Sequence, residues 1–316
     1  MSTTVNVTTS YAGESASKWV AASLLSAPTL EKDLVTIMPN VKYKAILHKL
    51  ATDGLLKDAS CDFSATSTVT LTERSIVPKE LQVNVKLCKS DFIDTWQAIE
   101  MGYSAHDVLP KSFADYLLAY MAEKVAAANE VSIWNGAAGT SGEFDGFMTK
   151  LTVDADLPTA NEIAGTTLTA ANISTELQKI VSAIPDAVYG KEDLYIYVSQ
   201  NAYRLYIQHL AGFGASGLGA NGYEGKGQNQ VFGDLFFNGV MLKVANGLTA
   251  NQMLCAEKSN LFFGTGLMSD QNEIKLLDQS AIDGSKNVNV VMRMTAGVEY
   301  ANVEDIVTYG ITNSAN

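Results

Sequence analysis

A run of alternating apolar residues constrains the fold of this chain more than any other feature. Four aliphatic residues occupy every second position of segment 81–87 (LQVNVKL), which would place them on one face of a strand: Leu81, Val83, Val85 and Leu87. The β-rich segment 62–72 (DFSATSTVTLT) precedes it, so we expect the two segments to pair as a long hairpin that turns near residues 73–78. An isolated two-stranded hairpin is only marginally stable in water. Its aliphatic face must therefore lie on a core formed later in the chain or on a second copy of the protein.

Composition limits the class of protein. The 316 residues allow one large domain or two, and 47% hydrophobic residues with a mean hydropathy of +0.06 supply an ample core. A net charge of −12 argues against a surface that grips nucleic acid. We expect no membrane span, because no apolar stretch approaches about 20 residues. We also expect no secretory signal, since the N-terminal MSTTVNVTTSYAGES has neither a basic head nor an apolar stretch. The chain runs from Met1 to Asn316, so we expect no long propeptide to be removed.

Three cysteines without a secretory signal suggest a reducing compartment. Cys61 and Cys88 would face each other across the expected hairpin. The alternatives are a cross-strand disulfide and two reduced, half-buried thiols, and the compartment favours the thiols.

The first 40 residues should form a loosely structured start. A Thr- and Ser-rich stretch leads into two short helical segments, 15–26 and 30–38, which Pro28 and Pro39 stop. Both are too short to be stable without a surface to pack on. Residues 41–45 then alternate in polarity, which predicts a strand.

The rest of the chain alternates between helices and strands. A long helix is expected over residues 112–134, with Gly136 at its stop, and a second over residues 173–184. Segment 193–199 should be a buried strand, followed directly by a helix over residues 200–210. Further strands are expected over residues 240–245, 252–256, 273–277, 288–295 and 306–309.

A glycine-rich stretch, AGFGASGLGANGYEGKG at residues 211–227, contains the G-x-G-x-x-G pattern of a phosphate-binding loop. That pattern needs a strand before it and a helix after it, whereas here a helix precedes the glycines. The negative end of the helix dipole would border the loop and repel phosphate. Ala220 and Gly227 also replace the first glycine and the Ser or Thr of a P-loop. We therefore expect a long surface loop.

The sequence offers no pattern of catalytic or metal-binding residues. His48, His106 and His209 lack partners at metal-ligand spacing, no Cys-x-x-Cys pair occurs, and the nucleophile-elbow pattern G-x-S-x-G is absent. Paired acids such as Glu304 and Asp305 are typical of solvated turns. We expect no catalytic residue, no metal and no cofactor, and hence no enzyme.

The order of these features resembles the major capsid proteins of tailed bacteriophages, which have the Hong Kong 97-type fold. The likeness covers essentially the whole chain and is closest to capsid subunits of phages with Bacteroidetes-type hosts. It rests on CKSDF (88–92) with Trp96, LPKSF (109–113), EVSIWNG (130–136) with FDGF (144–147), and the closing MRMTAGVEYANVEDIVTYG.

This resemblance implies an α+β fold with five parts. Residues 1–40 would be an N-terminal arm and residues 41–92 an extended β-hairpin loop that reaches over a neighbour. Residues 93–165 would hold the spine helix of a peripheral domain, 166–271 a mixed α/β axial domain, and 272–316 the returning peripheral strands. The glycine-rich loop would then lie near the axis of each pentamer or hexamer, where glycine tolerates several backbone conformations.

The resemblance also implies a function. The protein would assemble with itself into pentamers and hexamers of an icosahedral head, in the cytoplasm of a bacterial host, and become part of the virion. The shell would enclose double-stranded DNA without sequence-specific binding, which suits an acidic protein. Portal, scaffolding, and decoration or head-completion proteins would be its partners, and no membrane would be involved.

Two further functions are open alternatives: an encapsulin-like shell around a protein cargo, and a nucleotide-dependent α/β enzyme. Some family members cross-link a loop lysine to an asparagine of a neighbour, but no specific pair can be assigned here. Under the capsid reading, the expected assembly contacts fall in the arm, the hairpin and the glycine-rich loop: Trp19, Leu24, Val69, Leu71, Arg74, Val83, Val85, Gly212, Gly214, Gly217 and Gly219.

Overall fold

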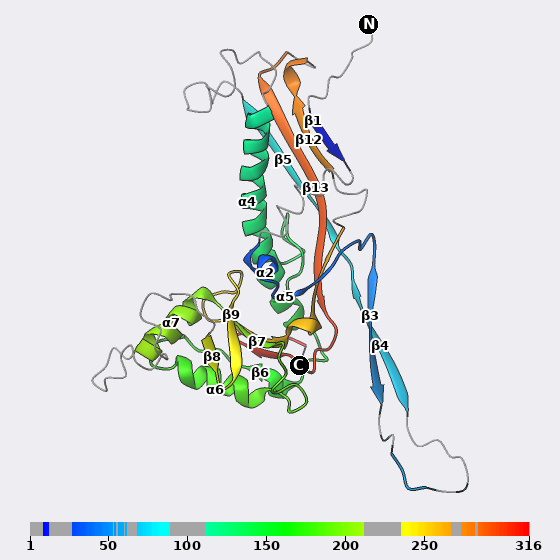
Figure 1. Ribbon diagram of the computed structural model, residues 1–316, viewed down its shortest axis with the longest axis vertical. Helices are drawn as coiled ribbons and strands as arrows, with labels where there is room; N and C mark the ends of the chain where they lie inside the picture. The colour runs from blue at the N-terminus through cyan, green and yellow to red at the C-terminus, as the bar shows by residue number, and fades with distance from the viewer. Residues whose placement is uncertain are drawn as a thin grey trace.

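The structure, a computed structural model, describes residues 9–12, 27–52, 54, 56–59, 61, 68–88, 111–211, 235–266, 273–281 and 284–315. Figure 1 shows a long lobe with one helix lying along it, a compact lobe beside its lower end, and a two-stranded ribbon that leaves the body on the other side. This mixed α+β arrangement agrees with the expected fold class. Each lobe has its own sheet and its own cluster of buried apolar residues.

The long lobe is built on one sheet with strand order β1-β12-β13-β11-β2, and β5 also pairs with β13. The strands are β1 (Thr9–Ala12), β2 (Thr36–Met38), β5 (Lys79–Cys88), β11 (Leu261–Thr265), β12 (Glu273–Asp278) and β13 (Asn287–Tyr300). The fourteen residues of β13 join β5, β12 and β11, so a strand near the C-terminus organises the sheet. Its inward residues, among them Val288, Val290 and Met292, are almost fully buried.

The spine helix α4 (Lys111–Asn135) lies along this sheet (Figure 1). It confirms the long helix predicted from sequence, and its end carries Ile133 and Trp134 into the core. Gly136 follows the helix without a positive φ, so it is not needed for a left-handed cap. It is needed for close packing, because a Cβ there would lie 2.3 Å from the carbonyl oxygen of Phe144.

The compact lobe has a second sheet with strand order β6-β14-β10-β7-β9-β8. Its strands are β6 (Glu162–Ile163), β7 (Leu194–Val198), β8 (Leu235–Phe237), β9 (Val240–Val244), β10 (Met253–Glu257) and β14 (Val307–Tyr309). Its helices α6 (Ile173–Ala183) and α7 (Gln200–Ala211) confirm the predicted helices over the same segments. Short elements complete the chain: α2 (Pro28–Glu31), α5 (Phe147–Leu151), η2 (Thr159–Asn161), η3 (Lys258–Asn260) and η4 (Gln279–Ala281).

A buried carboxylate joins the two lobes to the spine helix. Glu130 of α4 is 3% exposed, and its side chain accepts hydrogen bonds from the backbone N–H of Thr29 (2.9 Å), the Thr29 hydroxyl (2.7 Å) and the N–H of Asn246 (3.1 Å). The Trp134 indole also donates to the Thr29 hydroxyl at 2.8 Å. Glu130 therefore holds α2 and the β9–β10 connection against one turn of the helix.

The hairpin expected from sequence is wrong in its pairing. Strand β4 (Val69–Ile76) pairs with β3 (Ala45–Thr52), whereas β5 pairs with β13 over its whole length. The strand expected over residues 41–45 is also wrong, because it shares only Ala45 with β3. The aliphatic face of β5 rests on the chain's own core, because Leu81 is buried and Val83, Val85 and Leu87 pack against the long-lobe cluster. Of the two supports expected from sequence, the structure shows the core formed later in the chain, so this face does not need a second copy.

Other expectations were wrong in detail. The helix expected over residues 30–38 stops at Glu31, because Asp33 adopts a left-handed conformation (φ 54°) and the β-branched run that follows forms β2. The division into domains stays a prediction. Sheet membership cuts across the expected bounds, because β11 joins the long-lobe sheet whereas β6 and β14 join the compact-lobe sheet. Strands β1, β2 and β5, expected in the arm and the hairpin loop, also belong to the long-lobe sheet. The helix expected over residues 15–26 lies outside the described residues.

Candidate assembly surface

The ribbon formed by β3 and β4 is the candidate functional surface. The two strands pair in register from Ala45 with Ile76 to Thr52 with Val69, and Figure 1 shows them extending away from both lobes. Burial fades along the ribbon: Ile76 is fully buried at its base, whereas residues 50–52 and 69–73 are exposed. Because paired residues share a face, the ribbon has two sides of different chemistry.

The outward face is apolar and uncovered within the described chain. It carries four aliphatic side chains with large exposed fractions: Ile46 (46%), Leu50 (65%), Val69 (62%) and Leu71 (56%). Leu50 and Leu71 are direct cross-strand partners. Between them and the base, His48 Nδ1 lies 3.4 Å from a Glu73 carboxylate oxygen. An aliphatic row on a protruding ribbon is typical of a surface that another protein covers.

The opposite, inner face carries Arg74, which contacts the body. Its guanidinium donates to the carboxylates of Asp154 (2.7 Å) and Asp156 (3.2 Å), and its Cζ lies 4.8 Å from the centre of the Tyr300 ring. The Tyr300 hydroxyl donates to the same Asp154 oxygen at 2.5 Å. Burial works against ionisation of Asp154, but hydrogen bonds from Arg74, Tyr300 and the N–H of Asp156 prevail and lower its pKa below the ordinary value.

Lys49 is the second cation of the inner face. Its ammonium donates to the side-chain oxygen of Asn302 at 2.7 Å and lies 2.9 Å from a carboxylate oxygen of Glu304. Asn302 is itself held by Asn260, which accepts from its backbone N–H at 2.7 Å. The ribbon base is thus tied to two loops of the body, one after α5 and one between β13 and β14.

An apolar contact fixes the base of the ribbon. Ile76 fills the space above Gly264 of β11, where an added Cβ would lie 2.6 Å from the Ile76 Cγ2 atom. Val41, buried, closes the same site from the chain that leads into β3. Glycine at position 264 is therefore required for the ribbon to seat on the sheet.

The residues proposed from sequence are placed as follows. Val69 and Leu71 lie on the exposed outward face, Arg74 has intramolecular partners, and Val83 and Val85 pack on the chain's own core. Six lie outside the described residues: Trp19, Leu24, Gly212, Gly214, Gly217 and Gly219. Contact with a neighbouring copy stays a prediction for all of them.

Sequence reasoning missed three residues of the ribbon. Ile46 and Leu50 lie in AILHKLAT, where apolar residues occur at both odd and even positions, so the period-two signal is obscured. Lys49 gave no signal, because its partners follow more than two hundred residues later.

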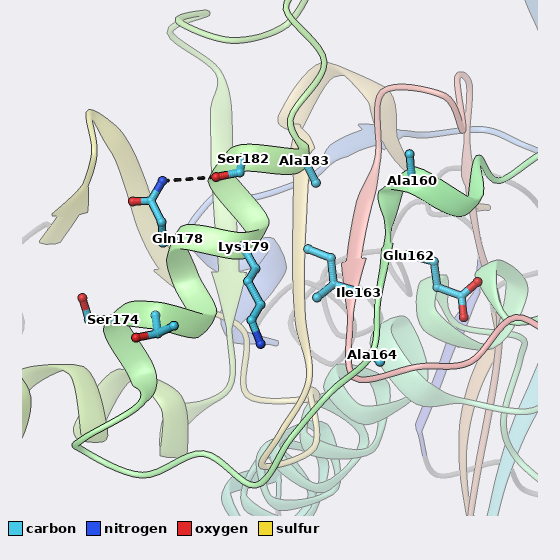
Figure 2. A pocket seen from close by; sticks show the side chains of 10 residues that line it. Ala160, Glu162, Ile163, Ala164, Ser174, Gln178, Lys179, Ser182 and Ala183 are labelled. Atoms are coloured by element: carbon cyan, nitrogen blue, oxygen red, sulfur yellow. Dashed lines mark hydrogen bonds between the residues drawn. The ribbon is translucent and has the colours of Figure 1, made fainter.

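A shallow groove of about 990 Å³ runs between α6 and β6 in the compact lobe. Figure 2 shows Gln178, Lys179 and Ser182 of the helix on one side and Ile163 of the strand on the other. Lys179 is engaged by Glu176 at 2.9 Å, and Gln178 donates to Ser182 at 3.2 Å.

The part of the chain that the structure describes contains no group of three or more His, Cys, Asp or Glu side chains arranged to hold a metal ion. None of its helices is long and apolar enough to cross a membrane. Cys61 is exposed and Cys255 is buried, and this burial raises the pKa of the Cys255 thiol far above its ordinary value. Helix α7 ends at Ala211, so the order of β7, helix and glycine-rich stretch is the reverse of that in a phosphate-binding loop.

No family model and no curated protein matches the sequence. Solved structures match over nearly the whole chain. The capsid of a native GTA particle is 14% identical with a TM-score of 0.60, covering 92% of this chain and 91% of that one. The Mycobacterium phage Adephagia structure is 15% identical with a TM-score of 0.56, covering 88% of each chain. The satellite phage P4 procapsid is 12% identical with a TM-score of 0.54, covering 93% of this chain and 99% of that one.

The chain has the Hong Kong 97-type capsid fold. It shares this fold with the three structures at only 12–15% sequence identity.

Proposed function

We propose that this protein is the major capsid subunit of a tailed phage, which assembles with itself into pentamers and hexamers of an icosahedral head. The observation that carries the proposal is the outward face of the ribbon. It presents Ile46, Leu50, Val69 and Leu71 to solvent on an element that extends away from its own body. The fold supports it, because the similar solved structures are phage and GTA capsids or procapsids.

Assembly into a shell would give the exposed apolar face of the ribbon a partner. Burying about 100 Å² of apolar area at each of several sites contributes about 2.5 kcal/mol apiece. Each contact is weak alone, but a subunit that touches several neighbours at once gains from multivalency. The occupant of the ribbon is then a second copy of this chain, and the free subunit can stay soluble at low concentration.

The charge of the chain suits the enclosure of DNA. With a net charge of −12, an acidic lining would not bind a packaged polyanion, so the genome would be held by confinement. Location in the virion, assembly in the host cytoplasm, and portal, scaffolding and decoration partners follow from the same proposal. The likeness to phages of Bacteroidetes-type hosts stays a prediction.

Two variants test the proposal. The double substitution Leu50→Ser with Leu71→Ser removes the cross-strand pair at the centre of the outward face, and Thr70→Ser on the inner face is the matched control. Negative-stain microscopy and light scattering over a concentration series should show closed shells for wild type and the control. The double variant should need a concentration at least about tenfold higher, since 1.4 kcal/mol is tenfold.

Unfolding of the unassembled subunits should differ by no more than about 0.5 kcal/mol between the variants, because the changed side chains are exposed. A wild-type protein that stays monomeric at every concentration would overturn the proposal. Shells that contain a protein cargo and no DNA when isolated from their host would favour the encapsulin-like alternative.

A further inference from the structure

The inner face of the ribbon carries an arrangement that the outward face does not need. Arg74 and Lys49 both bond to the body, and they lie where the burial of the ribbon ends. Beyond them both strands are exposed on both sides. Ile76 follows Arg74 by two residues and anchors the base of the ribbon. Arg74 and Lys49 therefore extend the contact between ribbon and body beyond this apolar anchor.

The body meets these cations with a ring of acceptors from separate loops. Asp154 and Asp156 follow α5, whereas Asn302 and Glu304 lie between β13 and β14. Asp154 is held on its other side by the Tyr300 hydroxyl, and its side chain is only 10% exposed. The Arg74 contact is therefore geometrically fixed, since a planar guanidinium is held by a carboxylate and an aromatic ring together.

The two cations are similarly exposed, but Arg74 has a nearly buried carboxylate partner, Asp154 (10% exposed), and Lys49 has an exposed one. Arg74 is 24% exposed and Lys49 28%, whereas their outer partners Asp156 and Glu304 are 80% and 63% exposed. Exposed ion pairs contribute little by themselves and are weakened by salt. The half-buried Arg74–Asp154 pair should therefore fix the direction of the ribbon. Lys49 should further restrict rotation of the ribbon relative to the body.

We propose that Arg74 and Lys49 are positioning residues, which set the direction of the ribbon in the free subunit so that its apolar face is already presented to an incoming copy. The effect of this positioning on assembly rests on the proposed function, whereas the positioning itself does not. Without the two contacts, the ribbon is attached by Ile76 and the two short connections at its base. Each assembling subunit would then have to order the ribbon on contact, and that entropy is subtracted from the binding free energy.

The direction of the ribbon can be measured without assembly. One nitroxide is placed on Cys61, which is exposed in the segment joining β3 to β4, and another on Ala127→Cys, exposed on α4, in a Cys88→Ser background. Pulsed electron spin resonance on dilute, unassembled subunits gives the distribution of distances between them. We expect the distribution to broaden about twofold in Arg74→Ala with Lys49→Ala, because the ribbon regains orientational freedom.

Three controls separate positioning from simple loss of structure. Lys44→Ala removes the charge of an exposed lysine just before β3 and should leave the distribution unchanged. Arg74→Lys keeps the positive charge but loses the planar guanidinium, so its distance distribution should be narrower than that of the double alanine variant and broader than that of wild type. Salt at about 1 M should broaden the wild-type distribution, since screening then acts within about 3 Å.

Assembly measured in parallel keeps this inference and the proposed function distinguishable. The Arg74 and Lys49 double variant should raise the concentration needed for shells by roughly tenfold, the equivalent of about one ordered residue. An unchanged distance distribution in the double variant would overturn the positioning role, whether or not shells form. A broadened distribution in a protein that never assembles would support the positioning role and overturn the capsid function.

Discussion

Replacing Glu130 by alanine should lower the unfolding free energy of the unassembled subunit by about 3 kcal/mol. The reason is the set of donors that this carboxylate satisfies. Thr29 is fully buried, and it directs both its backbone N–H and its hydroxyl at Glu130. Alanine leaves both donors without an acceptor in a site closed to water.

The magnitude follows from these two donors. A buried donor that loses its acceptor costs about 1–3 kcal/mol, so two of them give about 2–6. Position 246 is exposed, so the Asn246 N–H can turn to water and adds little. The wild-type protein also pays to bury a carboxylate, which places the expected value in the lower half of that range.

Two companion variants calibrate the measurement. Glu130→Gln keeps one acceptor oxygen but turns an amide toward the Thr29 N–H, so it should cost about 1–2 kcal/mol. Glu123→Ala, on the exposed side of the same helix, should stay within about 0.5 kcal/mol of wild type. Urea unfolding followed by fluorescence and circular dichroism gives the three values. If Glu130→Ala costs less than about 0.5 kcal/mol, or as little as Glu130→Gln, the junction does not hold the lobes as described.

Three further results are expected. Gly264→Ala should cost about 1–3 kcal/mol in urea unfolding, because its Cβ would lie 2.6 Å from the Ile76 side chain; a cost near zero would show that the ribbon base is not seated there. Gly247→Ala should be more damaging and reduce soluble expression, because its Cβ would lie 2.0 Å from the backbone oxygen of Glu130, which cannot move without bending α4. The pKa of Asp154 is lower in the folded protein than the value of about 3.9 in the unfolded chain, so its ionised form stabilises the fold above about pH 3.9. This stabilisation is lost as the pH falls through the folded pKa, so the stability difference between wild type and Asp154→Asn should shrink from about pH 7 to about pH 3. A difference that stays constant with pH would contradict the Arg74–Asp154 pairing.

Local structure was largely predictable from sequence, because periodicity and stop signals act over short distances. The spine helix, α6, α7 and most of the later strands were found this way. Short strands such as β2 and β6 were missed, since a few residues do not establish a period. The stop after α2 was also missed, because the left-handed Asp33 gives no compositional signal.

Strand pairing was not predictable for a different reason. The segments that contain β4 and β5 are both predicted as strands and lie close together in sequence, so they were expected to pair with each other as a hairpin. The actual partner of β5 is β13, and the choice depends on which face the rest of the chain buries. The residues of the candidate surface also differ in whether the local sequence predicts them. Val69 and Leu71 were expected because they lie in the β-rich segment 62–72, whereas the Arg74–Asp154 and Lys49–Asn302 pairs depend on tertiary contacts.

The pairing of β5 with β13 also sets when the protein can mature on the ribosome. β5 ends at Cys88 and β13 begins at Asn287, so about two hundred residues are synthesised between the two strands. Contacts so distant in sequence make folding slow, and a nascent polypeptide exposes the β5 aliphatics until β13 has left the ribosome. A chain that is still being translated therefore cannot present a finished long lobe to another molecule. Under the proposed capsid function, assembly would draw on a pool of released chains, and the supply of those chains would govern its onset.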